Sequence, residues 1–159
     1  MEKILGLKCR ETGRKYEKKP IHVCEMSFAP LEVDYNYEEI KKTISRKSIE
    51  NGPLSMWRYA DLLPLDGDPV TGLNTGFTPL IRAKNLAEAL GAKEIYIKDD
   101  TVCRPTLSFK DFAARFMAET MLRLKKEDES IIVLVATSGD TGSAIGNAYS
   151  NLEGIDVVI

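Results

Sequence analysis

Cysteine, histidine and tryptophan are scarce in this sequence: its 159 residues include three cysteines, one histidine and one tryptophan. An odd number of cysteines argues against a disulfide framework and fits the reducing cytoplasm. No run of eighteen apolar residues occurs, and the first residues lack the long apolar core of a signal peptide. The net charge of −2 does not suggest binding to nucleic acid or to a membrane. We therefore expect a cytoplasmic protein, which at 43% hydrophobic residues can bury a core.

Two cysteines near the N-terminus have the separation of the two halves of a zinc ribbon, but each half lacks its second cysteine. Thr12 stands three residues after Cys9, and Ser27 stands three residues after Cys24. Structural zinc requires four thiolate or imidazole ligands, and only Cys9, Cys24 and His22 are present here. We expect a degenerate ribbon over residues 1–33 that binds no metal, with His22 an ordinary surface or packed residue.

Residues 34–65 mix aromatic and charged side chains, with a helix predicted over 38–47. Such a segment is typical of an arm that wraps over a domain or dimer surface, and ordinary packing of the aromatics is the alternative. From residue 66 to residue 159, strands and helices alternate, which predicts a parallel doubly wound α/β sheet. The expected order is strand 78–82, helix 83–90, strand 94–98, a helix from Ser108, strand 131–135, helix 143–150 and a strand from Asp156.

A lysine lies in the opening turn of a strongly amphipathic helix. Lys110 lies in the first turn, just off an apolar stripe that holds helical spacing for four turns. Ser108 followed by Asp111 predicts a capping box at the helix start. The positive end of the helix dipole favours the neutral amine, which is the form that attacks a carbonyl in Schiff-base chemistry. A solvated surface lysine is the alternative.

The run Ile-Ile-Val-Leu-Val at 131–135 has the length of a strand buried on both faces. It leads into Thr137, Ser138, Gly139, Asp140 and Thr141, and then into a helix. Backbone N–H groups at such a helix start favour an anion, so this loop is a candidate anion site. A tight turn with ordinary helix caps is the alternative. The loop is not a Walker A loop, because no Gly-Lys-Ser/Thr follows at the required spacing.

Three motifs together resemble the threonine synthases, a family of pyridoxal-phosphate enzymes of fold-type II. They are Arg-Pro-Thr-Leu-Ser-Phe-Lys-Asp-Phe at 104–112, Ala-Thr-Ser-Gly-Asp-Thr-Gly at 136–142, and Asn-Thr-Gly-Phe-Thr-Pro-Leu at 74–80. The resemblance covers the chain from about Cys9, but only the front part of the enzyme. It implies an incomplete fold-type II sheet, preceded by the degenerate ribbon and the arm.

The resemblance also implies roles for the matched residues. Lys110 would carry pyridoxal 5'-phosphate as a Schiff base, and Asp140 would stand where many relatives place an asparagine beside the pyridine 3-oxygen. Thr137, Ser138, Gly139 and Thr141 would bind the substrate α-carboxylate. Ser108 and Lys98 would bind the substrate phosphate, or else be a helix cap and a strand-end surface charge. Asp140 and Phe112 fit one branch of the family, whereas the cysteine-containing start and the arm fit another.

The implied reaction converts O-phospho-L-homoserine and water to L-threonine and phosphate, which is a pyridoxal-phosphate-dependent carbon–oxygen lyase reaction acting on phosphates. The expected assembly is a homodimer. A threonine or serine dehydratase, or a cysteine synthase, of the same fold is an alternative, and an inactive fragment is another. In the family, the loop for the cofactor phosphate and the residue that caps the pyridine nitrogen come later than residue 159. We therefore expect this chain by itself to be inactive.

Overall fold

The computed structural model describes residues 2–159; Met1, the first residue of the predicted ribbon, lies outside them. Contacts between residues divide the chain into two units. The N-terminal unit contains the residues up to Gly52 together with Arg58–Asp66, and the C-terminal unit contains Pro53–Trp57 and Gly67–Ile159. Within residues 2–159, none of the helices has the length and apolar character needed to cross a membrane.

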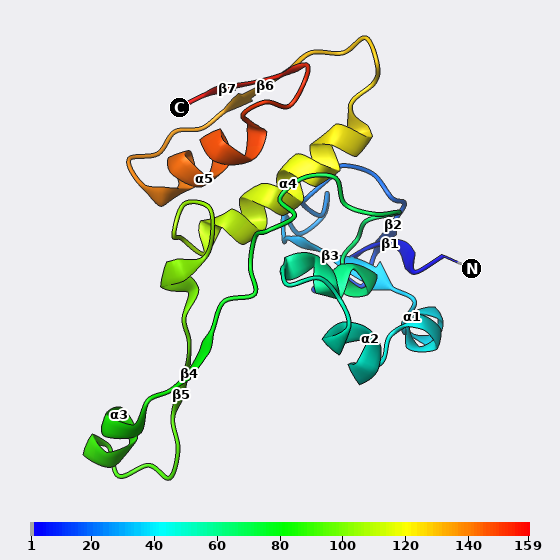
Figure 1. The fold of residues 1–159 in the computed structure, drawn as a ribbon. Helices are drawn as coiled ribbons and strands as arrows, with labels where there is room; N and C mark the ends of the chain where they lie inside the picture. Colours follow the sequence, from blue (N-terminus) through cyan, green and yellow to red (C-terminus); the bar gives the residue numbers. More distant parts are fainter. Residues whose placement is uncertain (1) are drawn as a thin grey trace. The chain divides into compact units, whose positions relative to one another are not determined.

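The N-terminal unit is a three-stranded antiparallel sheet followed by two short helices (Figure 1). The strand order is β2-β1-β3, with β1 at Ile4–Cys9, β2 at Lys15–Tyr16 and β3 at Leu31–Tyr35. The helices are α1, Tyr37–Thr43, and α2, Arg46–Glu50. A 3-10 segment, Met56–Leu62, follows them and bends at Tyr59.

The single helix predicted over 38–47 is wrong, because the chain breaks at Ile44 and Ser45. Ile44 is extended, and the Ser45 side chain accepts a bond from the Ser48 N–H while the Ser48 hydroxyl accepts one from the Ser45 N–H. This reciprocal capping box starts a second helix. Because of this two-residue break, the single predicted helix is two helices, α1 and α2.

The C-terminal unit has the predicted order of strands and helices. Its elements are β4 (Leu80–Arg82), α3 (Lys84–Ala89), β5 (Tyr96–Lys98), a 3-10 turn (Asp100–Val102), α4 (Lys110–Leu124), β6 (Ile131–Leu134), α5 (Asp140–Tyr149) and β7 (Ile155–Val158). Over residues 2–159, however, the strands form separate small sheets and no complete doubly wound sheet.

Strands β4 and β5 pair antiparallel, with Leu80 opposite Lys98 and Arg82 opposite Tyr96, so a parallel arrangement is wrong for this pair. The intervening helix α3 lies at the far end of the pair in Figure 1. A parallel pair needs a connection that carries the chain back to the start of the first strand. Because α3 is only six residues long and sits at the tip, the chain instead returns beside itself.

Strands β6 and β7 are parallel, as predicted, and α5 connects them. Helices α4 and α5 pack against one face of this pair. The buried core consists of Ala114, Ala118, Ala144, Ile145, Ala148, Tyr149 and Ile155, with Ile131, Val133 and Val157 packed on it. Burial of the strand on both faces is wrong here: Ile132 and Leu134 are 64% and 76% exposed. They point away from the only face that α4 and α5 cover.

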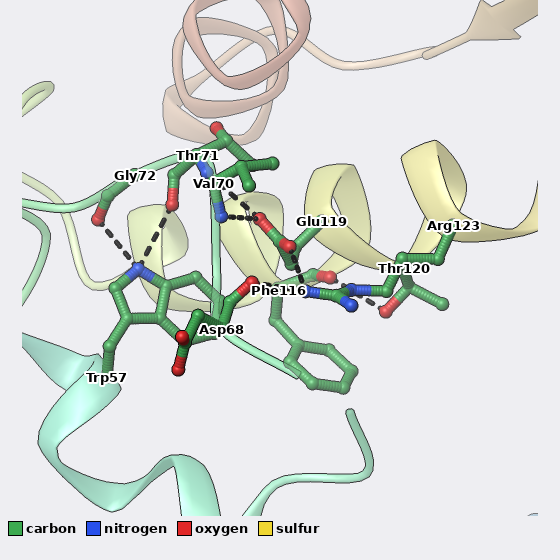
Figure 2. A network of polar contacts seen from close by, with 9 residues as sticks. All are labelled: Trp57, Asp68, Val70, Thr71, Gly72, Phe116, Glu119, Thr120 and Arg123. Atoms are coloured by element: carbon green, nitrogen blue, oxygen red, sulfur yellow. Dashed lines mark hydrogen bonds and ion pairs between the residues drawn. The ribbon is translucent and has the colours of Figure 1, made fainter. Parts of the chain in front are cut away.

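A buried carboxylate ties the connection before β4 to α4 (Figure 2). Glu119 is fully buried, and its Oε2 accepts the backbone N–H groups of Val70 and Thr71 at 3.0 and 2.9 Å. Its Oε1 accepts from Arg123 Nη2 at 2.5 Å, and Arg123 also donates to the Asp68 carbonyl at 2.8 Å. Charge-assisted hydrogen bonds, which are stronger than neutral ones, therefore hold the connection against the C-terminal half of α4.

The indole of Trp57 fastens the same connection from its other side (Figure 2). Trp57 is 3% exposed, and its Nε1 donates to the carbonyl oxygens of Thr71 and Gly72, each at 3.0 Å. Together with Glu119, it satisfies both the N–H and the C=O of Thr71. The backbone at residues 70–72 is thus held on both sides.

We expect Glu119→Ala to lower the free energy of unfolding of the C-terminal unit by about 3 kcal/mol, because two backbone N–H groups and a guanidinium lose their acceptor. Amide hydrogen exchange would show selective loss of protection at Val70 and Thr71. Glu127→Ala, at an exposed position, is the matched control and should change stability by less than about 0.5 kcal/mol. Equal protection in both variants would contradict the role given to Glu119.

Candidate active site

Lys110 is the first residue of α4, as the sequence predicted for a helix-start lysine. Its side chain is half-buried, and its Nζ lies 4.8 Å from the centre of the Phe109 ring. An aromatic face at this distance attracts an ammonium group through the ring quadrupole. The amine is therefore positioned at the surface of the unit by its helix and by one neighbouring ring.

The predicted capping box at this helix start is wrong. The N-cap residue is Phe109, and no side chain caps the helix. Ser108 is 5% exposed, and its Oγ accepts from the Lys110 N–H at 3.3 Å. Asp111 does not reach back to Ser108, because its two carboxylate oxygens accept the Thr106 N–H and the Thr106 hydroxyl, both at 2.9 Å.

Asp111 therefore holds the loop that leads to the lysine. Asp111 is completely buried, and the bonded Thr106 lies four residues before Lys110. Between them Leu107 has φ 61°, in the left-handed region that is strained for a branched side chain. Strain of this kind costs on the order of 1 kcal/mol and persists where surrounding contacts impose it. The Asp111 carboxylate supplies such contacts and fixes the approach to Lys110.

The loop at 137–141 has an open helix start. Helix α5 begins at Asp140 with Gly139 as its N-cap and no side-chain cap. The Thr137 Oγ1 instead accepts from the Gly139 N–H at 3.2 Å, while Ser138, Gly139 and Asp140 are exposed and Thr141 is half-buried. The alternative in which these side chains serve as ordinary helix caps is thus not realised. The Gly142 N–H donates to the Gly139 carbonyl at 3.0 Å. The N–H groups of Asp140 and Thr141 come before it, at the positive end of the helix dipole, where no earlier helical carbonyl can accept them, and this suits an anion.

Lys110 and the 137–141 loop lie at the same end of the α4–α5 pair. The two helices run in the same direction in Figure 1, and they pack through their alanines. At the opposite end, the Lys125 side chain lies against Gly154, so the C-terminal ends of the pair are also together. Within residues 2–159, no hydrogen bond or ion pair joins Lys110 to the loop, so the structure brings them to one end without a direct polar contact.

An open cavity of about 670 Å³ lies beside the Lys110 loop. Its walls are formed by residues 72–75 together with Arg104, Pro105, Leu107 and Arg115. Gly72, at φ 61°, is required here, because a Cβ would lie 2.7 to 2.9 Å from the Arg115 stem. The Arg115 guanidinium donates to Asn147 Oδ1 and to the Ala148 carbonyl, and burial lowers its pKa. Two arginines, Arg104 and Arg115, thus give this cavity positive charge.

The sequence did not single out Thr106, Arg115 or Glu119, and assigned Asp111 a different partner. A signal for Arg115 and Glu119 is present in the sequence. Both follow the lysine on a helix whose packing face is rich in alanine, and this spacing indicates charged side chains near the core.

Lys98 was a candidate for binding substrate phosphate. Its Nζ donates to the carbonyl and hydroxyl of Thr78, whose hydroxyl donates to Asp100 at 2.5 Å, so Lys98 is engaged within the β4–β5 region.

The three cysteines are free thiols, as expected. Cys9 and Cys24 are fully buried and share a cluster with Thr12 and Ser27, whereas His22 is exposed. Within the described residues, no group of three or more His, Cys, Asp or Glu side chains is placed to hold a metal ion. Hydrogen bonds from Ser27 and from the Tyr16 hydroxyl, 3.2 Å away, lower the pKa of Cys24 to about 5, although its burial opposes this.

A half-buried lysine at one helix start and an uncapped, glycine-containing loop at the next describe a cofactor-dependent α/β enzyme. Residues 72–159, more than half of the chain, match the family model for pyridoxal-phosphate dependent enzymes. The chain belongs to this family.

Within this family, the chain is similar to proteins named threonine synthase. The chain is 35% identical over 154 residues to a threonine synthase of Methanosarcina acetivorans and 33% identical over 154 residues to one of Methanocaldococcus jannaschii. Each match covers 96% of this chain but 36% of the relative. A threonine synthase of Escherichia coli is 47% identical over 55 residues, which are 35% of this chain and 13% of that protein. No solved structure matches the chain.

We expect Cys24 to be a thiolate at neutral pH and to lose its thiolate absorbance in the ultraviolet as the pH falls through about 5. A thiol whose folded-state pKa is lowered stabilises the fold fully above its unfolded pKa of about 8.5, and this stabilisation is lost as the pH falls towards the folded value. The absorbance step should be absent from Cys24→Ser and kept in Cys103→Ser, because burial raises the pKa of Cys103. Hydrogen bonds from Ser27 and Thr12 also lower the pKa of Cys9, so Cys9→Ser is the second control. A step near pH 5 that survives Cys24→Ser and is lost in Cys9→Ser would refute the assignment.

Proposed function

We propose that the protein containing this chain is a threonine synthase, which converts O-phospho-L-homoserine and water to L-threonine and phosphate. The observation that carries the proposal is the similarity over 96% of the chain to two proteins with that name. Because the chain spans 36% of their length, it accounts for part of such an enzyme. The family match fits the dehydratase and cysteine synthase alternatives equally well, and the similarity to named threonine synthases favours threonine synthase over them.

The residues present fit pyridoxal phosphate. Lys110 offers a primary amine that is only half-buried, so a carbonyl can reach it. The space beside Gly139 is open, since a Cβ built there would meet no atom within 4 Å, and the start of α5 is uncapped. When bound, pyridoxal phosphate supplies an electron sink that stabilises negative charge on carbon next to the substrate amine. Lys110 would hold the group, and the exposed carboxylate of Asp140 would lie next to its ring.

In this proposal Lys110 Nζ would also accept and return the proton at the substrate carbon. It stands at the end of a packed helix, on an approach fixed by the Asp111–Thr106 bonds. A base held in this way gains from orientation, which can contribute several orders of magnitude to a rate. The lysine is thus positioned by the helix and by the preceding loop.

The start of α5 would take the substrate carboxylate. Thr137, Ser138, Gly139 and Thr141 surround the free N–H groups there, and the Ser138 side chain is exposed. The cavity beside Arg104, Pro105 and Leu107 would take the substrate phosphate, since the exposed Arg104 lines it and a guanidinium group binds phosphate with two parallel hydrogen bonds. Arg115, which donates to Asn147 and Ala148, would add positive charge there. Ser108 stays a candidate for binding the substrate phosphate, whereas Lys98 donates to Thr78.

Phosphate release tests the proposal. The protein containing this chain should release phosphate from O-phosphohomoserine, and should act far more weakly on serine, threonine and O-acetylserine. Lys110→Arg should reduce turnover by at least about a thousandfold, because an arginine cannot form the covalent link. Lys93→Arg, an exposed lysine in the same unit, is the matched control and should keep full activity. Turnover of serine or O-acetylserine without phosphate release from O-phosphohomoserine would sink the proposal.

A further inference from the structure

The N-terminal unit contains two turns with the same backbone structure. In the first, the Cys9 N–H donates to the Arg14 carbonyl and the Gly13 N–H donates to the Cys9 carbonyl, both at 2.9 Å. In the second, the Cys24 N–H donates to the Ala29 carbonyl and the Phe28 N–H to the Cys24 carbonyl, again at 2.9 Å. The fifth residue of each turn is left-handed, with φ 70° at Gly13 and 57° at Phe28. The two turns are therefore structural repeats, each starting with a cysteine.

Each repeat places a hydroxyl three residues after its cysteine, and the two turns interlock through these side chains. Cys9 Sγ lies 3.4 Å from Ser27 Oγ, and Cys24 Sγ lies 3.7 Å from Thr12 Oγ1. Each thiol thus meets the hydroxyl of the opposite turn. Both cysteines are fully buried. We name these four residues, Cys9, Thr12, Cys24 and Ser27, the thiol–hydroxyl cluster.

Backbone and phenol donors complete the cluster. The Thr12 N–H donates to Cys9 Sγ at 3.5 Å, and the Tyr16 hydroxyl donates to Cys24 Sγ at 3.2 Å. Both sulfur atoms therefore have hydrogen-bond partners, and neither needs a further ligand. The cluster is closed by hydrogen bonds among residues of the two turns and β2.

The distances between the side-chain atoms of the cluster match those of a tetrahedral metal site, but two of the four atoms are not those of metal ligands. Four sulfur ligands at about 2.3 Å from zinc lie about 3.8 Å from one another, close to the 3.4 and 3.7 Å found across the cluster. Zinc in structural sites takes thiolate or imidazole ligands, and a serine or threonine hydroxyl is neither. With two cysteines and two hydroxyl residues, the cluster supplies only two of the four ligands that a resident zinc ion requires.

We propose that Thr12 and Ser27 stand where a metal site would have two further ligands, so that hydrogen bonds between sulfur and hydroxyl groups join the two turns without an ion. The backbone keeps the geometry of a metal site. It therefore binds a thiophilic divalent cation when both hydroxyl residues are replaced by cysteine. The proposal has two parts, one tested with the natural chain and one with a cysteine variant of it. The natural chain holds its N-terminal unit together in the absence of metal. The same chain with cysteine at all four positions of the cluster binds one zinc ion. Neither part depends on Lys110 or on the function proposed above.

The first experiment is the double substitution Thr12→Cys/Ser27→Cys in the whole 159-residue chain, kept reduced. After dialysis against zinc, we expect about one zinc per chain, and with Co(II) the visible absorption of tetrahedral thiolate coordination. The matched control is Ser45→Cys/Ser48→Cys, which adds two thiols at the same three-residue spacing in the same unit. The control should retain no stoichiometric zinc. Equal zinc retention by the two double variants, or no zinc in either, would overturn the proposed geometry.

The second experiment uses the natural chain, so it does not depend on the folding of a variant. Amide hydrogen exchange at Cys9, Gly13, Cys24 and Phe28 should be the same with and without a strong chelator, and the purified chain should contain no stoichiometric metal. Thr12→Val/Ser27→Ala, which removes both hydroxyls, should speed exchange at these four amides. Stoichiometric metal in the natural chain, or loss of protection on chelation, would overturn the proposal.

Discussion

Two buried carboxylates on one helix hold in place the loop that leads to Lys110 and the connection before β4. Asp111 and Glu119 of α4 are both completely buried, and each accepts hydrogen bonds from a segment that precedes the helix in sequence. A buried carboxylate is costly unless its oxygens are bonded, so each imposes one position on the segment that satisfies it. Asp111 thereby fixes the approach to Lys110, and Glu119 fixes the wall of the neighbouring cavity.

The second constraint is the close packing of α4 on α5. Their contact is made by small side chains, Ala114, Ala118, Ala144 and Ala148, which let the two helices approach closely. Because the helices run in the same direction, this contact places Lys110 and the uncapped start of α5 at one end. In the function proposed above, the amine would hold the cofactor and the helix start would bind the substrate carboxylate.

The sequence predicted the elements better than it predicted their partners. The helix that starts near Lys110 and the β6–α5–β7 unit follow from local periodicity and strand length, and the structure contains both. The partner of Asp111 was wrong because the helix starts one residue later than predicted, with Phe109 as its N-cap, so Asp111 is not at the position from which a capping box reaches back, and its carboxylate bonds Thr106. The direction of β5 was wrong because it depends on where α3 lies in space. The spacing of Cys9, Thr12, Cys24 and Ser27 marked a degenerate ribbon, but not the hydrogen bonds that hold it.

The central claim, that Lys110 is the cofactor lysine, is tested most directly by chemical labelling. The protein containing this chain is incubated with pyridoxal phosphate, reduced with borohydride, digested and mapped by peptide mass. The account predicts a pyridoxyl group on the peptide that contains Lys110, and its loss in Lys110→Arg with the label not moving to another residue. A label on another lysine, with Lys110 unmodified, would contradict it.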